Sequence, residues 1–498
     1  MSSVRALNQL MLLASEVGDL IELRFDCVES TELGQCLKEI RRLMDSLDHP
    51  VIITFRPAEQ GGKRALAHET RLQFWLFDKP NGAAFCDIEF DLVTGLASST
   101  FAKGCLDWQT VICSHHDFVG VPVDLEQIYE RMAGTPARIL KVAVHADDVT
   151  DCIPVFKLLE RARREGREMI AIAMGAAGIA TRILGPSRGS FLTYGALETD
   201  GATAPGQLTA KELRELYRVD QITEQTLIMG LVGLPVGHSV SPHVHNAAFA
   251  AAGVNGVYIP FEVRDAKSFF GRIVHPQTRE IDWNLRGLSI TAPHKATVMD
   301  DLDWVEPAAQ EIGAVNTVVV VGDALHGYNT DATSVLKPVI ERFGSLRDSR
   351  CAIIGAGGAA SAALWSLRRE GACVTVFARN FQKTNSLAEK FGARYENLEA
   401  ARFDAFDLVI NATPLGTCGQ RENETPAISD QLRGARFAYD LVYNPTETRF
   451  LREARDAGCE TLGGLSMLVQ QATEQFKLWT GADAPIEVMR VAAERALQ

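Results

Sequence analysis

Short, almost wholly apolar runs alternate with longer stretches of helical periodicity between residues 17 and 197. Apolar runs of this length are typical of parallel strands that are buried on both faces. The alternation with helices predicts a (β/α)8-type barrel. Its first strand is predicted to be missing, because the chain opens directly on the helical pattern of residues 4–16. The seven expected strands read LIELRFD, VIITFR, FCDIEF, TVICSHHDF, RILKVAVH, MIAIAMG and SFLTYGAL.

The pattern changes at residues 217–226, where a polar, charged segment precedes a new apolar strand at 227–232. We therefore expect a domain boundary there, followed by two further α/β units and a helical C-terminal segment that packs back on the first of them. The predicted regions are residues 1–222, 223–333, 334–466 and 467–498.

Residues 351–360 read CAIIGAGGAA, a buried strand that ends in glycines and runs into a helical stretch. Glycines in such a turn let the chain bend sharply and let its backbone approach a pyrophosphate, while the helix N-terminus supplies positive potential. This predicts a Rossmann dinucleotide-binding domain. The expected contacts are Gly355, Ala356, Gly357, Gly358 and Ala359.

The residues after the next strand indicate which dinucleotide is bound. An NAD-binding domain usually has Asp or Glu here, whereas this chain has Arg379-Asn380 with Lys383 one turn further on. These cations suit a 2′-phosphate, so the predicted cofactor is NADP(H). The alternative is a glycine-rich turn with two solvated cations. Asn411 and Thr413 follow a later strand and are expected near the dinucleotide, although a strand-end Asn is often only a turn residue.

Composition narrows the class of protein. The 498 residues are 46% hydrophobic and 23% charged, and the net charge of −13 disfavours nucleic acid or an anionic membrane as a partner. The ten cysteines show no C-x-x-C pair and no His/Cys array, so we expect buried, reduced thiols and no metal site. No apolar run is long enough to span a bilayer, and a cytoplasmic location is predicted.

Several barrel strands end in polar residues, which would meet at one rim: Glu22, Arg24, Arg56, His116 and Lys141. A lysine with apolar neighbours is desolvated, which favours the neutral amine that attacks a ketone to give a Schiff base. A nearby histidine could then move protons between carbon and oxygen. From spacing alone, the lysine could equally point outward and the histidine could be satisfied by Asp117.

The segments IELRFD, TFRPAEQGG, SHHDF, LKVAV, MGAAGIATR and ATAPGQL resemble the motif series of type I 3-dehydroquinate dehydratase, from residue 4 to about 218. The resemblance implies that Lys141 forms an imine with the substrate ketone and that His116 is the general acid/base. It also implies a set of residues that hold the substrate hydroxyls and carboxylate: Glu22, Arg24, Arg56, Arg182, Thr203 and Gln207.

The chain departs from this family pattern at a few positions. Thr203 and Thr181 stand where serine is common, and both keep a hydroxyl. Gln60 stands where many members have a glutamate that assists the histidine, and the adjacent Glu59 could partly substitute.

From residue 227 to the end the chain resembles shikimate dehydrogenase, through GLPVGHSVSP, GLSITAPHKATVM, IGAVNTV, GYNTDATS, IIGAGGAA, VINATPLG, YDLVYNPTETRFL and GGLSMLVQQA. The resemblance pairs Lys295 with Asp331 as the proton relay at the reacting hydroxyl. Ser239 and Ser241 suit the substrate carboxylate, although an S-x-S-P element alone is usually a helix cap. Ser289 replaces the usual asparagine. The remaining family positions for substrate are Thr291, Asn316, Tyr443 and Gln471.

The two halves fit one reaction sequence, because dehydration of 3-dehydroquinate gives 3-dehydroshikimate, which NADPH reduces to shikimate. We therefore predict a bifunctional enzyme of aromatic amino acid biosynthesis with small-molecule substrates. One alternative is a quinate/shikimate dehydrogenase with a weak dehydratase half. The other is a catalytically inactive sensor of these metabolites, which the presence of Lys141, His116, Lys295 and Asp331 argues against. The oligomeric state is not predicted.

Overall fold

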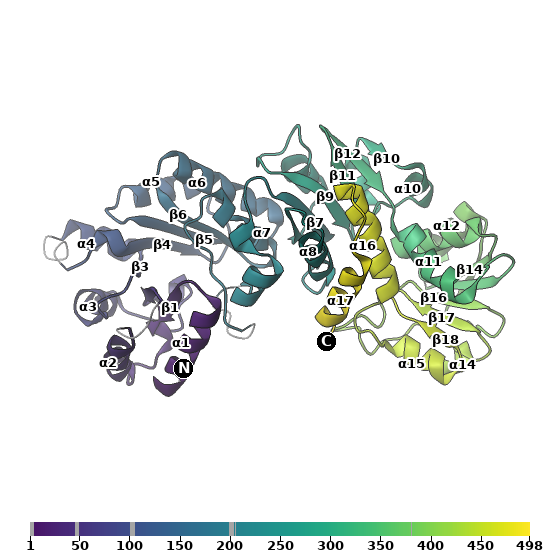
Figure 1. The fold of residues 1–498 in the computed structure, drawn as a ribbon, viewed down its shortest axis with the longest axis horizontal. Coiled ribbons are helices and arrows are strands. Elements are labelled where there is room, and N and C mark those ends of the chain that lie inside the picture. The colour runs from purple at the N-terminus through teal and green to yellow at the C-terminus, as the bar shows by residue number, and fades with distance from the viewer. Residues whose placement is uncertain (1–3, 45–48, 100–104, 199–203, 205, 380) are drawn as a thin grey trace. The chain divides into compact units, whose positions relative to one another are not determined.

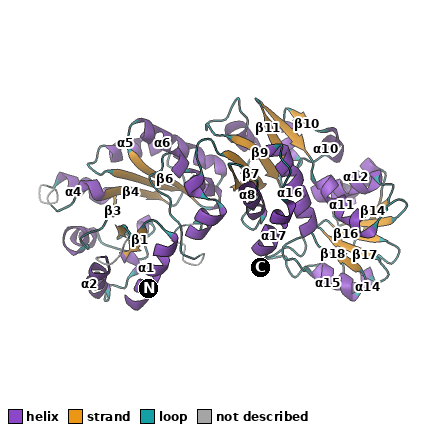
Figure 2. Ribbon diagram, in the orientation of Figure 1, coloured by secondary structure: helices purple, strands orange, loops and turns teal. Residues whose placement is uncertain are grey.

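The computed structural model describes residues 4–44, 49–99, 105–198, 204, 206–379 and 381–498 (Figure 1). Contacts between Cα atoms divide the chain into two compact units. The first contains residues 1–226, 259–265 and 280–283, and the second contains the rest. Helices alternate with strands in both units (Figure 2).

The first unit is built on one sheet of six strands in sequential order, and all the adjacent pairs are parallel. The strands are β1 (Ile21–Arg24), β2 (Val51–Thr54), β3 (Phe85–Glu89), β4 (Val111–Asp117), β5 (Ile139–His145) and β6 (Glu168–Met174). The helices are α1 (Val4–Val17), α2 (Leu33–Met44), α3 (His68–Gln73), α4 (Phe90–Ser98), α5 (Leu125–Ala133), α6 (Cys152–Arg164) and α7 (Ile179–Leu184).

Six of the seven predicted barrel strands are confirmed, and the seventh is wrong. The SFLTYGAL segment makes only isolated bridges, from Ser190 to Met169 on β6 and from Ala196 to Thr209. A barrel strand in this place needs a neighbour on each side, and among the described residues β1 and β6 are the two edges of the sheet, with no strand between them. The sheet of the described residues is therefore an open, barrel-like sheet.

The sheet that follows along the chain is mixed, in the order β10-β12-β11-β9-β7-β8. Its strands are β7 (Leu227–Gly233), β8 (Gly256–Glu262), β9 (Leu285–Ile290), β10 (Trp304–Val305), β11 (Thr317–Val321) and β12 (Ala324–Tyr328). The helices along this part of the chain are α8 (Ser241–Ala251), α9 (Ala266–Phe269), α10 (Pro307–Ile312) and α11 (Asp331–Phe343).

The next sheet is wholly parallel, in the order β15-β14-β13-β16-β17-β18. This order is the doubly wound arrangement of dinucleotide-binding domains. The strands are β13 (Arg350–Ile354), β14 (Cys373–Ala378), β15 (Arg394–Asn397), β16 (Leu408–Asn411), β17 (Phe437–Asp440) and β18 (Glu460–Leu462). The helices are α12 (Gly358–Arg369), α13 (Phe381–Phe391), α14 (Ser429–Leu432) and α15 (Arg449–Asp456).

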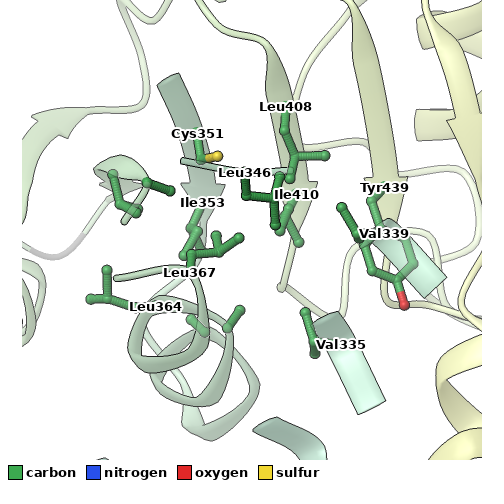
Figure 3. Close-up of a cluster of buried hydrophobic side chains, with 14 of the residues drawn as sticks. Val335, Val339, Leu346, Cys351, Ile353, Leu364, Leu367, Leu408, Ile410 and Tyr439 are labelled. Carbon is green, nitrogen blue, oxygen red and sulfur yellow. The ribbon is translucent and has the colours of Figure 1, made fainter. Parts of the chain in front are cut away.

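Apolar side chains from strands and helices form the core beside this parallel sheet. Ile353 and Ile410 extend from β13 and β16 toward Leu364 and Leu367 of α12, and Val335 of α11 belongs to the same cluster (Figure 3). This packing fixes the position of the turn between β13 and α12, where the glycines lie.

The chain ends in α16 (Leu465–Thr480) and α17 (Ile486–Ala496). Their buried residues Phe476 and Met489 share a core cluster with Met229 of β7 and Phe249 of α8. The Trp479 Nε1–H also donates a hydrogen bond to the Val318 carbonyl of β11 at 3.1 Å. The last helices therefore pack on the mixed sheet, and α16 lies close to the residues that precede β11.

The α/β fold class predicted from the sequence is confirmed, with an open, barrel-like parallel sheet followed by a mixed sheet and a doubly wound Rossmann sheet. Among the described residues, no helix combines the length and apolar character needed to cross a membrane. Nor do those residues contain a group of three or more His, Cys, Asp or Glu side chains placed to hold a metal ion.

Candidate active sites

Lys141 lies on β5 with its side chain only 5% exposed. Its Nζ donates a hydrogen bond of 2.7 Å to Oδ2 of Asp87 on β3. Burial and the positive charge of Arg56 lower the pKa of Lys141, whereas Asp87 acts in the opposite direction. The side chain therefore points into the unit as a desolvated amine, and the outward-pointing alternative does not apply.

His116 lies near the end of β4, the strand next to β5. Burial, followed by the positive charges of Arg56 and Lys141, lowers the pKa of His116 well below its ordinary value. The imidazole is therefore neutral at neutral pH and can accept a proton. Asp117 does not hold this histidine as the alternative required, because its Oδ1 accepts hydrogen bonds from the N–H groups of Val119 and Gly120.

Asp87 is a central residue that the sequence analysis missed. Its Oδ2 is 2.7 Å from Lys141 Nζ and 2.7 Å from Arg56 Nη2, although the Arg56 N–H is not aligned for a hydrogen bond. Burial would raise the pKa of Asp87, but the charges of Arg56 and Lys141 outweigh it and hold the pKa well below its usual range. FCDIEF was interpreted only as a buried strand, and the signal overlooked was two acids at alternating positions within it.

The second of those acids is Glu89, at the end of β3 and fully buried. It lies 3.8 Å from Arg56 Nε and accepts a hydrogen bond from Arg71 at 3.3 Å. Burial raises its pKa to about 7. Basic and acidic side chains therefore alternate from Lys141 through Asp87 and Arg56 to Glu89.

The predicted substrate-binding side chains of the first unit differ in how far they are already engaged. Glu22 accepts a hydrogen bond of 2.6 Å from the Thr54 hydroxyl. Arg24 donates two hydrogen bonds to Asp26, at 2.9 and 2.7 Å. Arg182, on α7, is only 2% exposed, and no carboxylate among the described residues pairs with it.

Burial lowers the pKa of Arg182 to about 10, which reflects the cost of a buried cation without an acidic partner. A carboxylate brought by a ligand would supply that partner. Arg182 is thus the cation of this unit best suited to the acid group of a substrate.

The positions that depart from the family pattern are placed as follows. Gln60 is half-buried and its Oε1 has no partner among the described residues, whereas Glu59 is exposed and cannot substitute for an inward-facing acid. The Thr181 hydroxyl is used within the fold, where it accepts a hydrogen bond from the Ala173 N–H at 2.9 Å. Gln207 is half-buried. Thr203 lies outside the described residues.

The second unit has its own lysine and acid. Lys295 Nζ lies 2.5 Å from Oδ2 of Asp331, the first residue of α11. The Lys295 side chain is 21% exposed, while that of Asp331 is 1% exposed. Asn316 donates a hydrogen bond of 2.8 Å to Oδ1 of Asp331, so each oxygen of the acid has its own donor. The two predicted relay residues are therefore in direct contact.

One predicted substrate ligand, Asn316, contacts this pair directly, and a second lies next to Asn316. Gln471 of α16 lies within 3.5 Å of the Asn316 amide. The Ser239 and Ser241 hydroxyls are 3.1 Å apart at the start of α8. Tyr443 is half-buried, and burial raises its pKa, so that it remains a neutral hydrogen-bond donor.

Two neighbouring strand-end residues behave differently from one another. Thr291 directly follows β9, and its backbone N–H bonds to the Val232 carbonyl at 2.8 Å. Ser289, which replaces the usual asparagine, is buried and donates its hydroxyl to Gln475 Oε1 at 2.9 Å. Ser289 is therefore engaged with α16.

The glycine-rich turn has the shape that a dinucleotide needs. Gly355 has φ +129° and a side chain there would meet the Ala412 carbonyl at 2.9 Å. A side chain at Gly357 would meet nothing within 4 Å, so this part of the turn faces open space. Gly358, the first residue of α12, lies so close to Lys295 that an added Cβ would be 3.3 Å from Lys295 Cδ. The turn thus fits a pyrophosphate and borders the catalytic pair. Ala356 lies in this turn and Ala359 is the second residue of α12, and both are half-buried.

Asn411 and Thr413 are held together at the end of β16. Asn411 Oδ1 accepts from the Thr413 N–H at 3.0 Å and from its hydroxyl at 2.7 Å. The Asn411 amide donates to Asp440 of β17 at 2.9 Å. Asp440 is fully buried, and burial raises its pKa to about 6. Asn411 is thus a turn residue in its bonding, and it fixes Thr413 beside the glycine-rich loop, where Gly355 approaches it.

Arg379 follows β14 directly and is exposed. No acidic side chain among the described residues pairs with it. Asn380 and the side chain of Lys383 lie outside what the structure describes. Of the predicted 2′-phosphate ligands, Arg379 is therefore the one that the structure places, at the carboxyl end of a strand of the Rossmann sheet.

Comparison with protein families matches four stretches of the chain. Residues 1–224 match the type I 3-dehydroquinase family and residues 231–318 match the shikimate dehydrogenase substrate binding domain. Residues 338–441 match the shikimate/quinate 5-dehydrogenase family, and residues 464–494 match the shikimate 5′-dehydrogenase C-terminal domain.

Individual relatives agree with these matches. A chloroplastic bifunctional 3-dehydroquinate dehydratase/shikimate dehydrogenase of Arabidopsis thaliana is 32% identical over 496 residues, covering 95% of this chain and 80% of the relative. An NADP(+) shikimate dehydrogenase of Moorella thermoacetica is 40% identical over 54% of this chain and 93% of its own length. A crystal structure of a shikimate dehydrogenase in complex with NADP+ superposes with a TM-score of 0.52 at 35% identity, covering 56% of this chain and 98% of that chain.

Proposed function

The chain belongs to the family of bifunctional 3-dehydroquinate dehydratase/shikimate dehydrogenases, and on that premise we propose which residues carry out each reaction. It is a shikimate-pathway enzyme with a lyase half and an oxidoreductase half. The observation that carries the assignment is that each half holds one lysine in contact with one buried aspartate: Lys141 with Asp87, and Lys295 with Asp331.

In the dehydratase half, the neutral Nζ of Lys141 attacks the ketone of 3-dehydroquinate, and loss of water gives a protonated imine. His116 then removes a proton from the adjacent carbon, which gives an enamine. The enamine electrons expel the hydroxyl on the next carbon, and His116 returns its proton so that the hydroxyl leaves as water. Hydrolysis of the imine releases 3-dehydroshikimate and restores Lys141.

We propose that Arg182 binds the substrate carboxylate, because it is the buried cation that lacks an acid. The hydroxyls are bound by Glu22, Arg24 and Arg56 around Lys141, and by Gln207 and Thr203. Asp87 is proposed as the counter-ion of the protonated imine, since its Oδ2 already contacts Lys141 Nζ. Gln60 is neutral, so His116 works without a glutamate at that position.

In the dehydrogenase half, NADPH, when bound, supplies the hydride to the carbonyl carbon of 3-dehydroshikimate. Lys295 donates the proton that the developing hydroxyl requires, and Asp331 holds the Lys295 ammonium in place. Asn316 keeps the other oxygen of Asp331 occupied. The proposed substrate contacts are Ser239 and Ser241 for the carboxylate, and Thr291, Asn316, Tyr443 and Gln471 for the hydroxyls.

A relative of the dehydrogenase half is named as an NADP(+) shikimate dehydrogenase, and a similar solved structure is a complex with NADP+. For this chain we propose NADP(H), bound at the turn of residues 355–359 with Thr413 beside it and the 2′-phosphate at Arg379, with Asn380 and Lys383. An exposed cation directly after β14 supports this choice, because an NAD enzyme needs an acid at that place. The cytoplasm is the proposed compartment, which fits ten cysteines of which none is in a disulfide.

A coupled assay tests the whole assignment. Purified protein given 3-dehydroquinate and NADPH is expected to oxidise NADPH and to form shikimate, with 3-dehydroshikimate as the intermediate. If NADPH is oxidised in the presence of 3-dehydroshikimate but not in the presence of 3-dehydroquinate, the dehydratase assignment is refuted. A strong preference for quinate with NAD would replace the shikimate assignment by the quinate dehydrogenase alternative.

A further inference from the structure

An aromatic ring lies over the nitrogen that forms the imine. Tyr194 follows β6 within the segment whose ends, Ser190 and Ala196, are held by isolated bridges. The centroid of its ring is 4.2 Å from Lys141 Nζ. At this distance the negative face of the ring attracts a cationic nitrogen, and most strongly where water is excluded. Lys141 is thus in contact with Asp87 and with Tyr194.

The hydroxyl of Tyr194 is buried and has no hydrogen-bond partner among the described residues. An unpaired buried hydroxyl is costly, and native proteins rarely leave one without a ligand, water or side chain. Glu22, Asp87, Arg56 and Arg24 are close enough to perturb this hydroxyl electrostatically. These are the same groups that surround the proposed substrate.

We propose that Tyr194 is a further catalytic residue of the dehydratase, whose ring stabilises the positively charged imine nitrogen on Lys141 and whose hydroxyl donates a hydrogen bond to a hydroxyl oxygen of the substrate. The proposal rests on imine formation at Lys141. The ring favours the protonated imine over the carbinolamine and the neutral imine, and only the protonated imine makes the adjacent carbon acidic enough for His116 to remove its proton.

The two parts of the side chain have different expected effects. The ring acts on a charge that exists only after the amine has reacted or is protonated, so its loss lowers the rate of the chemical steps. The hydroxyl contacts an oxygen that is present in the bound substrate throughout, so its loss weakens binding.

The test compares Tyr194→Phe with Tyr194→Leu in the full-length protein. Tyr194→Phe is expected to raise KM for 3-dehydroquinate about five- to tenfold with kcat nearly unchanged, as for the loss of one neutral hydrogen bond. Tyr194→Leu is expected to show the same rise in KM and an additional fall of about tenfold in kcat and in the rate of borohydride trapping.

Phe191→Leu is the matched control, because it removes an aromatic ring from the same segment. Phe191 packs against Phe85 and lies over Arg138, and no contact joins it to Lys141 among the described residues. It should therefore leave kcat and KM near the wild-type values. Thermal unfolding of each full-length variant, compared with that of the wild type, reports whether the first unit is folded.

The outcomes separate this proposal from the one on which it rests. Wild-type protein that is never trapped by borohydride would overturn imine formation itself. If trapping occurs in the wild type but Tyr194→Phe has unchanged KM, the hydroxyl contact is refuted. If Tyr194→Leu and Tyr194→Phe have equal kcat, the ring has no role in stabilising the charge.

Discussion

The two proposed catalytic lysines, Lys141 and Lys295, show how different surroundings suit the same side-chain type to different chemical roles. Lys141 is 5% exposed, lies within a strand and has a second cation, Arg56, on the same carboxylate. Lys295 is 21% exposed, lies in a turn after β9 and is the only cation among the described residues that pairs with Asp331. Burial and a like charge favour loss of the proton from Lys141, as a nucleophile needs. Lys295 instead keeps partial access to solvent and direct contact with one carboxylate oxygen, a geometry that suits a proton relay.

The largest expected effect comes from removing the Lys141 amine, and it tests whether the two lysines serve separate reactions. Lys141→Ala is expected to reduce dehydratase turnover by at least about 10⁴-fold, since covalent catalysis is lost, and to abolish borohydride trapping of 3-dehydroquinate. NADPH-dependent reduction of 3-dehydroshikimate should be unchanged in the same preparation. Substrate that is still trapped by the Lys141→Ala protein would refute the assignment of the nucleophile.

Lys295→Ala should have a large effect confined to the other half. We expect kcat for 3-dehydroshikimate reduction to fall about 10²–10⁴-fold, the usual contribution of a general acid, with a smaller rise in KM. Dehydratase activity, measured separately, is the internal control. A change in KM alone would make Lys295 a binding residue without a part in proton transfer.

Arg379→Ala sharpens the description of the second site. Loss of the cation is expected to raise KM for NADPH about 10–100-fold, because one charge-assisted hydrogen bond to the 2′-phosphate is lost. KM for NADH, which has no 2′-phosphate, should be nearly unchanged. Initial rates with both cofactors measure this. Equal losses for both would place Arg379 outside the 2′-phosphate site.

Asp87→Asn tests the electrostatic side of the comparison. Asp87 raises the pKa of both Lys141 and His116, while burial and Arg56 lower them. Removing its charge therefore lowers both pKa values further. Because imine formation needs the neutral amine, the acidic limb of the trapping rate against pH should move to lower pH, by about one unit for each 1.4 kcal/mol of lost interaction.

The control for that shift is Asp331→Asn, which changes an aspartate of similar burial at the other site and should leave the dehydratase profile unmoved. A shift to higher pH, or none, in Asp87→Asn would show that Asp87 does not set the protonation of Lys141.

Apolar runs in the sequence were enough to predict six barrel strands and the strands β13 and β14 of the Rossmann sheet, because a strand that is buried on both faces consists almost wholly of apolar residues. The seventh strand failed because its pairing depends on a neighbour that is distant in sequence. Asp87 was missed for a similar reason. Nothing local to FCDIEF shows that its acid meets a lysine 54 residues away.

The sequence also could not show which charged side chains were already satisfied. Arg24 and Arg182 look alike as single cations, yet Arg24 is paired with Asp26 while Arg182 has no acid among the described residues. Arg24 could have been recognised from the acid two positions away. For Arg182, only the folded chain shows which groups surround it.

The contact between Gly358 and Lys295 has a consequence for interpreting variants of the nucleotide-binding turn. A Cβ atom added at residue 358 would lie 3.3 Å from Cδ in the aliphatic part of the Lys295 side chain. Alanine there would push the amine relative to Asp331 while also narrowing the dinucleotide cradle. Such a variant would therefore bind the coenzyme more weakly and also transfer the proton from Lys295 more slowly. Measuring the rate at different coenzyme concentrations would not by itself separate the two effects.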